Sequence, residues 1–203
     1  MKNELKKICV MASFPKRKES MLKVVESIFK QCDVLCLWLN EYSEIPNELN
    51  KYKNLDIRLG GTNGNIKDAG KFAFLDKYYD CYYMTIDDDI EYPHNYVQSL
   101  TRNIDRYGRK CIIAYHGHGR YPMYKKYHYK YIAFYETLNE DHLVNIRTGT
   151  GVTGFVPNEI HVPILSIDRL HTIDTDVSFG VWANNNNISM ICCAHHSGWL
   201  KNI

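Results

Sequence analysis

Cys81-Tyr-Tyr-Met-Thr-Ile-Asp-Asp-Asp89 is an apolar run that ends in three consecutive carboxylates. A continuous apolar run of this length predicts a β-strand that is buried on both faces, as in a parallel sheet. In open α/β sheets, ligands bind beyond the carboxyl ends of the strands, where Asp87, Asp88 and Asp89 stand. Adjacent carboxylates repel one another, so Mg²⁺ or Mn²⁺, which prefer oxygen ligands, would neutralise them. The alternative is an acidic turn that caps the next helix.

Strands and helices alternate around this segment. We expect strands at residues 8–12, 34–39, 54–59, 81–86 and 111–115, with helices at 17–31, 67–80 and 93–107. This alternation predicts an α/β fold with a mainly parallel central sheet flanked by helices. Beyond residue 115 the pattern is less regular: residues 117–135 are rich in Tyr, His and Lys, and we expect a flexible loop at 149–154, a helix at 178–185 and a strand at 188–194. The length of 203 residues fits a single domain.

The composition excludes several classes of protein. The formal net charge is +2, whereas dedicated nucleic-acid binders carry a strong basic excess. No apolar run approaches the roughly 18 residues that a membrane span needs, and no long apolar segment follows the charged N-terminus as in a signal peptide. The seven cysteines show no metal-binding or redox spacing, and most sit in apolar runs, which favours a reducing compartment. We therefore expect a cytoplasmic protein.

Four further segments carry residue types with chemical potential. Asp174 and Asp176 precede an amphipathic segment, so either is a candidate general base or a helix N-cap. The glycine- and asparagine-rich stretch 60–71 brings lysines that could meet a phosphate, or that are simply solvated at a turn. His195-His196 could supply a metal ligand or be structural.

The fourth segment, residues 115–135, holds seven tyrosines, three histidines and four lysines or arginines. Such a mixture suits sugar stacking, anionic groups or a membrane surface, and the alternative is a loop whose tyrosines pack on the core. His116 and His118 would share a face if extended, which leaves a metal role open.

Taken in order, these segments resemble nucleotide-sugar glycosyltransferases of the GT-A fold, which is a Rossmann-like layered fold. The similarity is to small bacterial members of the family 2 type, which build capsule or lipopolysaccharide. It is carried by Ser13-Phe-Pro-Lys-Arg17, by Asn65-Ile-Lys-Asp-Ala-Gly-Lys71, by Thr85-Ile-Asp-Asp-Asp-Ile-Glu-Tyr-Pro93, which looks like an Asp-x-Asp motif, and by Asp174-Thr-Asp-Val177 before a helix.

The resemblance implies a role for each matched residue. Asp176 or Asp174 would be the catalytic base, and the loop at 149–154 would lie beneath the donor sugar. Residues 1–115 would bind the nucleotide-sugar and residues 116–203 the acceptor. The implied nucleotide-binding residues are Ser13, Pro15, Arg17, Asn40, Lys67, Asp68, Lys71, Asp87 and Asp88, and the implied metal ligands are Asp87, Asp89, His195 and His196.

The implied reaction is a Mn²⁺- or Mg²⁺-dependent, inverting transfer of a sugar from a nucleotide-sugar, foremost a UDP-sugar, to a hydroxyl of a glycan or lipid-linked glycan. Two other functions stay open: a nucleotidyltransferase that makes an activated sugar, and a carbohydrate-binding scaffold without turnover. A peripheral contact at the inner face of the membrane also stays open.

Overall fold

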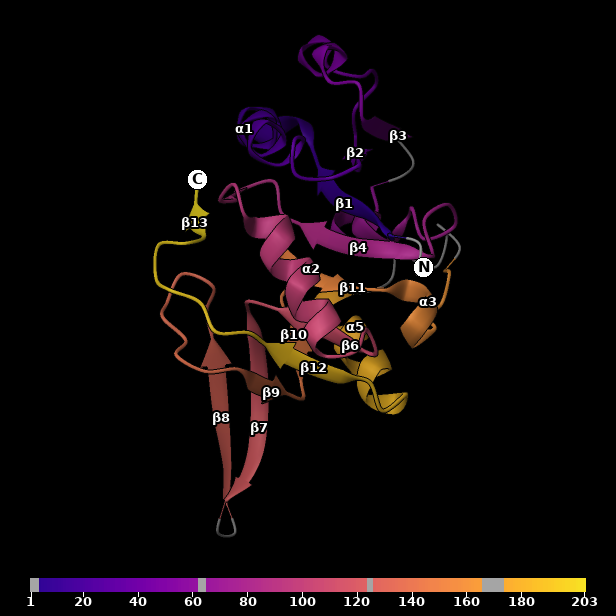
Figure 1. The fold of residues 1–203 in the computed structure, drawn as a ribbon. Coiled ribbons are helices and arrows are strands. Elements are labelled where there is room, and N and C mark those ends of the chain that lie inside the picture. Colours follow the sequence, from indigo (N-terminus) through magenta and orange to yellow (C-terminus); the bar gives the residue numbers. More distant parts are fainter. Residues whose placement is uncertain (1–3, 62–64, 124–125, 166–173) are drawn as a thin grey trace.

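The structure is a computed structural model that describes residues 4–61, 65–123, 126–165 and 174–203, with the backbone alone described between 121 and 128. Within these residues, eight strands form one central sheet in the order β3-β2-β1-β4-β11-β6-β12-β9 (Figure 1). In one half of this sheet, strands that follow residue 115 in the sequence, β11 and β12, alternate with strands that precede it, β4 and β6. The expected α/β architecture, a mainly parallel sheet flanked by helices, is confirmed. Part of the expected turn, residues 62–64, lies outside the described residues.

One half of the sheet is wholly parallel. It contains β1 (Lys6–Ser13), β2 (Val34–Asn40), β3 (Leu55–Gly61) and β4 (Cys81–Ile86). The expected strands of this half are confirmed. β1, β2 and β4 are apolar runs that the sheet buries, while β3, at the edge of the sheet, alternates apolar and charged residues and is only partly buried. Their carboxyl ends all lie along one edge, as parallel strands require.

The other half contains both strand directions. β6 (Cys111–Ala114) and β12 (Ser189–Cys192) are parallel, and β9 (His142–Val144) is antiparallel to β12. β11 (Val152–Phe155) lies antiparallel between β4 and β6. The expectation of a flexible loop over 149–154 is therefore wrong from Val152 onward. Gly154 fits there because a Cβ would lie 2.8 Å from Leu100, so the helix above packs onto bare backbone.

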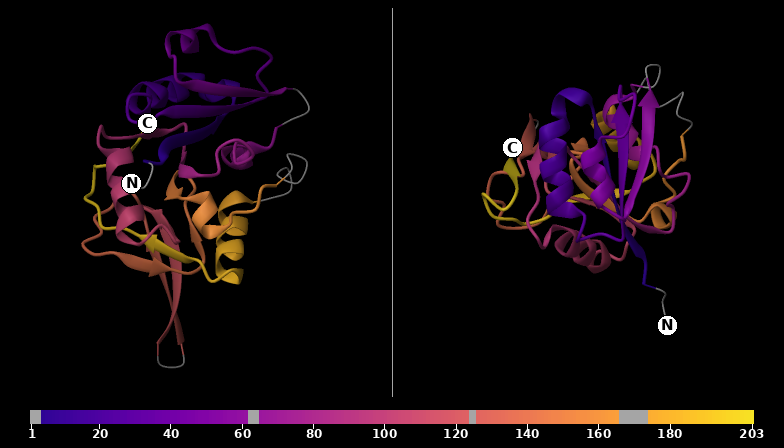
Figure 2. Two further views of the ribbon diagram at one scale, coloured as in Figure 1. Left: turned by 45° about the vertical axis from the view of Figure 1, so that its right-hand side comes forward. Right: turned by 90° about the horizontal axis from the view of Figure 1, so that it is seen from above.

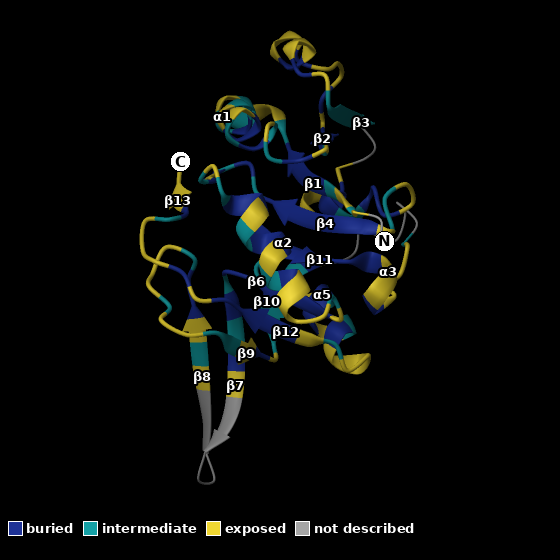
Figure 3. Ribbon diagram, viewed as in Figure 1, coloured by how far each residue is buried: buried dark blue, intermediate teal, exposed yellow. Residues whose placement is uncertain are grey.

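Helices cover both faces of the sheet (Figure 2). α1 (Lys18–Ile28) and α2 (Tyr96–Arg106) pack on one face, and α3 (Pro157–Ile160), α5 (Thr175–Asn185) and the 3₁₀ helix η3 (Lys67–Phe72) on the other. Side chains of β1 alternate between the two cores, with Cys9 and Met11 facing α1 and Ile8 and Val10 facing η3. The central strands are accordingly buried along their length in Figure 3.

Two expected elements differ from the structure. The helix predicted over 67–80 is only η3 followed by turns. Lys67 starts it in the left-handed region at φ 50°, and Gly70 presses against the ring of Trp38, where a Cβ would be 2.5 Å away. Within 117–135, the irregular segment expected from the sequence is largely a hairpin of β7 (Gly117–Met123) and β8 (Lys126–Ile132), with β10 (Arg147–Thr148) beside β7.

The hairpin extends away from the body of the molecule in Figure 1 and in the left view of Figure 2. Short elements complete the chain: the 3₁₀ helices η1 (Pro15–Arg17) and η2 (Asn47–Lys51), and the strand pair β5 (Ile90–Glu91) and β13 (Lys201–Asn202). Among the described residues, no helix combines the length and the apolar character that crossing a bilayer requires.

Candidate active site

A polar cavity of about 480 Å³ lies at the carboxyl ends of the parallel strands. Ser13 ends β1, Asn40 ends β2, and Asp87 follows β4, so the strand order brings the three side chains together. Arg17 and Asp68 line the same cavity, which we call the acidic pocket. It stands where open α/β sheets hold their ligands.

The three aspartates of the acidic pocket are paired with cations of the protein itself. Arg17 donates to Asp88 over 3.0 Å and also pairs with Asp89, while Lys71 pairs with Asp87. Asp88 also accepts a 2.6 Å hydrogen bond from the Ser13 hydroxyl. Arg17 and Lys71 thus supply positive charge for which the sequence alone suggested a metal ion. Pro15 starts the 3₁₀ helix η1 that presents Arg17.

Lys71 is a buried cation, with only 2% of its surface exposed. Burial lowers the pKa of Lys71, but the nearby Asp87, Asp68 and Asp176 outweigh it, so the net pKa is raised and the ammonium stays charged. Asp88 behaves in the opposite way. Its burial raises the carboxyl pKa, against the opposing pull of Ser13 and Arg17. The site therefore combines a buried ammonium that stays charged, that of Lys71, with a carboxyl that ionises less readily than usual, that of Asp88.

The two later aspartates have separate roles. Asp174 is the N-cap of α5, and its side chain accepts the Val177 N–H over 3.3 Å. Asp176, in the first turn of the helix, points inward and accepts from both the amide (3.0 Å) and the hydroxyl (2.7 Å) of Thr150. The helix-capping alternative thus accounts for Asp174, while Asp176 is free of any capping duty.

A smaller cavity of about 200 Å³ adjoins the acidic pocket and shares Asp68 and Asp87 with it. We call it the Asp176 pocket, because Asp176 lines it together with His116 and Phe134. The Lys71 ammonium lies 3.4 Å from the Thr150 hydroxyl, so a polar chain runs from Asp87 through Lys71 and Thr150 to Asp176. Residues 150 and 176, far from Asp87 in sequence, are thereby fixed beside it.

Asn40, Lys67 and Asp68 all line the acidic pocket, but the side chain of Asn40 makes its hydrogen bonds within the protein. Its side-chain oxygen accepts from Trp38 Nε1 and Ile66 N, each at 3.0 Å, and its amide donates to the Lys67 carbonyl. Asn40 therefore holds the loop that carries Lys67. Glu41, opposite, has φ 59°, and Lys67 has φ 50°, so the rim contains two strained non-glycine residues, as functional sites often do.

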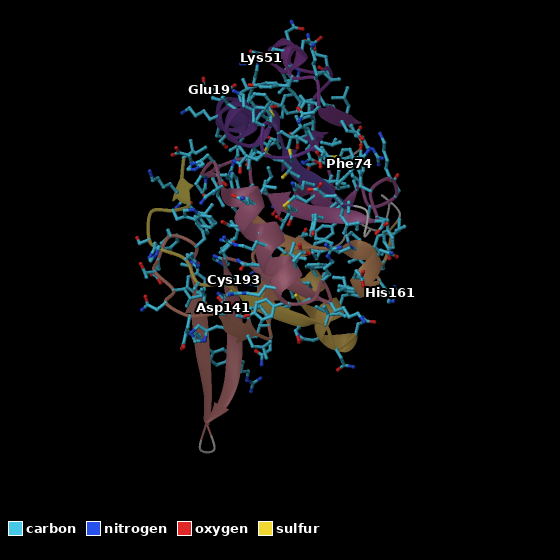
Figure 4. The ribbon with its side chains drawn as sticks, viewed as in Figure 1. Glu19, Lys51, Phe74, Asp141, His161 and Cys193 are labelled. Carbon is cyan, nitrogen blue, oxygen red and sulfur yellow. The ribbon has the colours of Figure 1, made fainter. Side chains whose placement is uncertain are left out.

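The structure does not bring His195 and His196 to the aspartates. Both line a separate cavity of about 290 Å³ that shares no residue with the acidic pocket. The ring nitrogens of His195 lie 2.7 Å from the Cys193 carbonyl and 3.2 Å from the Ala133 carbonyl. Figure 4 labels Cys193 and Asp141, which line that cavity, near the base of the hairpin.

Among the described residues, no group of three His, Cys, Asp or Glu side chains is arranged to hold a metal ion. This applies to His116 and His118 as well, whose rings stack at 6.2 Å between centroids. A metal ion at the acidic pocket would therefore take protein oxygens from the Asp87–Asp89 run and the remainder from bound ligand or water.

Three contributors to the site were not named individually from the sequence: Tyr92, and Thr150 and Gly151 of the loop at 149–154 that the resemblance placed beneath the donor sugar. The Tyr92 hydroxyl accepts from Asp87 N over 2.8 Å and donates to the Gly151 carbonyl, which fastens the end of β4 to the chain entering β11. A Cβ at Gly151 would overlap the Asp87 carboxylate, so any larger residue there would displace that side chain. The pair of glycines around Thr150 was the available signal for a close approach of backbone.

Comparisons with known proteins bear on the fold. No family model matches the chain, and no curated protein matches it. Among solved structures, it is similar to the crystal structure of S. aureus TarS residues 1–349, a GT-A-like glycosyltransferase, with a TM-score of 0.51 and 14% identity. The match covers 95% of this chain and 60% of the TarS 1–349 chain, so the chain spans less than two thirds of that structure. With the sheet order and the pocket at its carboxyl edge, this similarity shows that the chain has a Rossmann-like glycosyltransferase fold.

Proposed function

We propose that this protein transfers a sugar from a nucleoside-diphosphate sugar, with UDP-sugars as the first choice, to a hydroxyl group of a glycan or lipid-linked glycan. The observation that carries the proposal is the position of Asp176. A carboxylate from the last helix stands in a pocket that adjoins the acidic pocket and shares Asp87 with it. A donor site and a general base are thus side by side, and the glycosyltransferase fold agrees with that arrangement.

The acidic pocket suits a nucleoside diphosphate on two grounds. Arg17 lines the acidic pocket and can bind a phosphate in bidentate fashion, while Lys71, which lines the adjoining Asp176 pocket, adds a second cation behind Asp87. Asp88, which already accepts from Ser13, can accept from ribose hydroxyls. When a diphosphate binds, the cations that now pair with the aspartates gain a second anionic partner.

The carboxylates of Asp87 and Asp89 fit Mg²⁺ or Mn²⁺, because both are hard oxygen donors on one short loop, at least a third exposed. Those two residues would hold the ion once Arg17 turns from Asp89 toward phosphate. When bound, the ion supplies electrostatic stabilisation of the leaving diphosphate. His195 and His196 take no part in this proposal.

Asp176 acts as the general base. It takes the proton of the acceptor hydroxyl while that oxygen bonds to the anomeric carbon of the donor, and the bond from that carbon to the diphosphate breaks. Attack opposite the leaving group inverts the configuration. Thr150 orients Asp176 with its two hydrogen bonds and keeps the carboxylate beside the shared wall of the two pockets.

The test is the release of nucleoside diphosphate from a panel of nucleotide-sugars with Mn²⁺, with and without EDTA and an acceptor mixture. We expect one donor to be consumed in an EDTA-sensitive way. Asp176→Asn should lower turnover by about 10² or more and leave UDP binding intact. The matched variant Asp174→Asn should keep the wild-type rate, because asparagine is an equally good N-cap.

Loss of turnover in Asp174→Asn but not in Asp176→Asn would show that the wrong carboxylate has been assigned. If no donor is consumed and UDP does not raise the thermal stability of the protein, the transferase proposal fails and a scaffold function takes its place.

A further inference from the structure

One face of the β7–β8 hairpin carries aromatic and basic side chains that the proposed chemistry does not use. In the antiparallel register, His118 lies opposite Tyr131 and Arg120 opposite Tyr129, so the four side chains share a face. Tyr129 is 71% exposed and Tyr131 50% exposed. The guanidinium of Arg120 lies over the Tyr129 ring, 5.8 Å from its centroid. We call these four residues the hairpin face.

Ring contacts connect the hairpin face to the Asp176 pocket. Tyr131 touches the rings of His118 and His116, at 4.7 and 5.0 Å between centroids. The His116 ring in turn lies 6.0 Å from that of Phe134. Because His116 and Phe134 line the Asp176 pocket, a series of ring contacts leads from Tyr131 of the hairpin face to the pocket of the proposed base.

The residue types of this series suit the apolar faces and the hydroxyl groups of sugar rings. Flat aromatic rings stack on the C–H faces of pyranoses, while tyrosine and histidine offer hydrogen bonds at their edges. Burial, together with the nearby Arg147, lowers the pKa of His118, and burial is also the main cause that lowers the pKa of His116. Both rings are therefore neutral at pH 7, and each can accept from a sugar hydroxyl.

We propose that the hairpin face binds an oligosaccharide chain whose terminal sugar enters the Asp176 pocket. The acceptor would then be a polymer rather than a free monosaccharide, and this inference rests on the proposed transferase function. In extended geometry, residues 116 to 120 advance about 13 Å, a length that accommodates two or three consecutive sugars. A membrane surface is a poorer occupant, since no aliphatic side chain occurs among the four residues of the hairpin face.

The test uses the full chain and an array of immobilised oligosaccharides, from disaccharides to octasaccharides, neutral and phosphate-bearing. We expect wild type to be retained best by longer chains of one class. Tyr129→Ala should weaken that retention by about three- to tenfold, and Tyr129→Phe should restore it because the ring remains. The control is Tyr107→Ala, an exposed tyrosine at the end of α2, which should bind as wild type does.

Release of nucleoside diphosphate without acceptor is measured in parallel, so that failure of the inference is distinguishable from failure of the transferase function. If donor release is normal but Tyr129→Ala and Tyr107→Ala are retained equally, or if no oligosaccharide retains wild type, the inference is overturned and the transferase proposal stands. It is also overturned if Tyr129→Ala instead loses sedimentation with anionic phosphatidylglycerol vesicles. If no donor is consumed and UDP does not raise the thermal stability of the protein, both proposals fall together.

Discussion

Lys71 supplies a buried positive charge next to the acidic pocket. It is buried, it pairs with Asp87, and it lies 3.4 Å from the Thr150 hydroxyl. Lys71→Met would leave Asp87 without its counter-ion and should lower the free energy of unfolding by about 3 kcal/mol. Urea unfolding at pH 7 measures this change. The control is Lys77→Met, which breaks the more exposed pair with Asp56 and should cost less than about 1 kcal/mol. Equal losses in the two variants would show that the Lys71 pair is no stronger than a surface pair.

Asp88 should make the folded protein less stable as the pH rises. Burial raises the pKa of this carboxyl above its ordinary value of 3.8, so the folded chain holds the proton more tightly than the unfolded chain does. Stability linked to this group is therefore fully present below that value and falls as the pH rises through the raised pKa. We expect Asp88→Asn to equal or exceed wild type at pH 7, by up to about 1 kcal/mol, with no difference near pH 3.

Urea unfolding of both proteins between pH 3 and pH 7 checks the sign. A variant that is clearly less stable than wild type at pH 7 would mean that the bonds from Ser13 and Arg17 outweigh the burial. Nucleotide binding should weaken in the same variant even where its stability gains.

At the scale of the element, the segment that enters β11 separates activity from stability. In Gly151→Ala the new Cβ displaces the Asp87 side chain from Lys71, while in Gly154→Ala it presses on Leu100 of α2. We expect Gly151→Ala to lose most donor turnover with little change in stability. Gly154→Ala should lose about 1–3 kcal/mol and keep its turnover at low temperature. Thermal melts with donor-release assays on both variants measure this, and the reverse pattern would contradict the role given to Asp87.

The elements that could be predicted are those whose own residues determine them. Apolar runs such as those of β2 and β4 become buried strands wherever they lie, and the acidic turn follows β4 directly. The strand β11 could not be predicted, because it is short and contains a glycine, which weakens a strand on its own, and it is held in place by pairing with β4 at Ile86 and by packing against Leu100. The hairpin was missed for a related reason, since the alternation of tyrosines with lysine and histidine along 126–131 gives a weaker contrast between the two faces than aliphatic and charged residues would.

The same distinction holds in the candidate site. Asp87, Asp88 and Asp89 can be recognised as a candidate site because three carboxylates are adjacent in the sequence. The roles of Asp174 and Asp176 cannot be separated in this way, because they depend on the contact of Asp176 with the distant residue Thr150. From the spacing in the sequence, either carboxylate could be the general base and either could be the helix cap. Only the fold shows which one is turned inward.

For the whole molecule, ligand binding should appear as added thermal stability. UDP with Mn²⁺ at about 100 times its Kd should stabilise the folded state by about 2.7 kcal/mol. That corresponds to a rise in Tm of about 5–10 °C for a chain of this length. Asp89→Ala should reduce the Mn²⁺-dependent part of the rise, and differential scanning fluorimetry with and without EDTA measures it. An equal rise with EDTA would show that Arg17 and Lys71 suffice without a metal ion.

The antiparallel strand β11 also governs how the chain is completed during synthesis. Once residue 115 has left the ribosome, β1 to β4 can pair, but β6 has no neighbour, since both of its partners, β11 and β12, come later. Until residue 155 emerges, the nascent chain therefore displays two unsatisfied sheet edges, one on β4 and one on β6, which invite intermolecular pairing. A ribosome-bound fragment ending before β11 is thus the stage at which this protein most needs a chaperone.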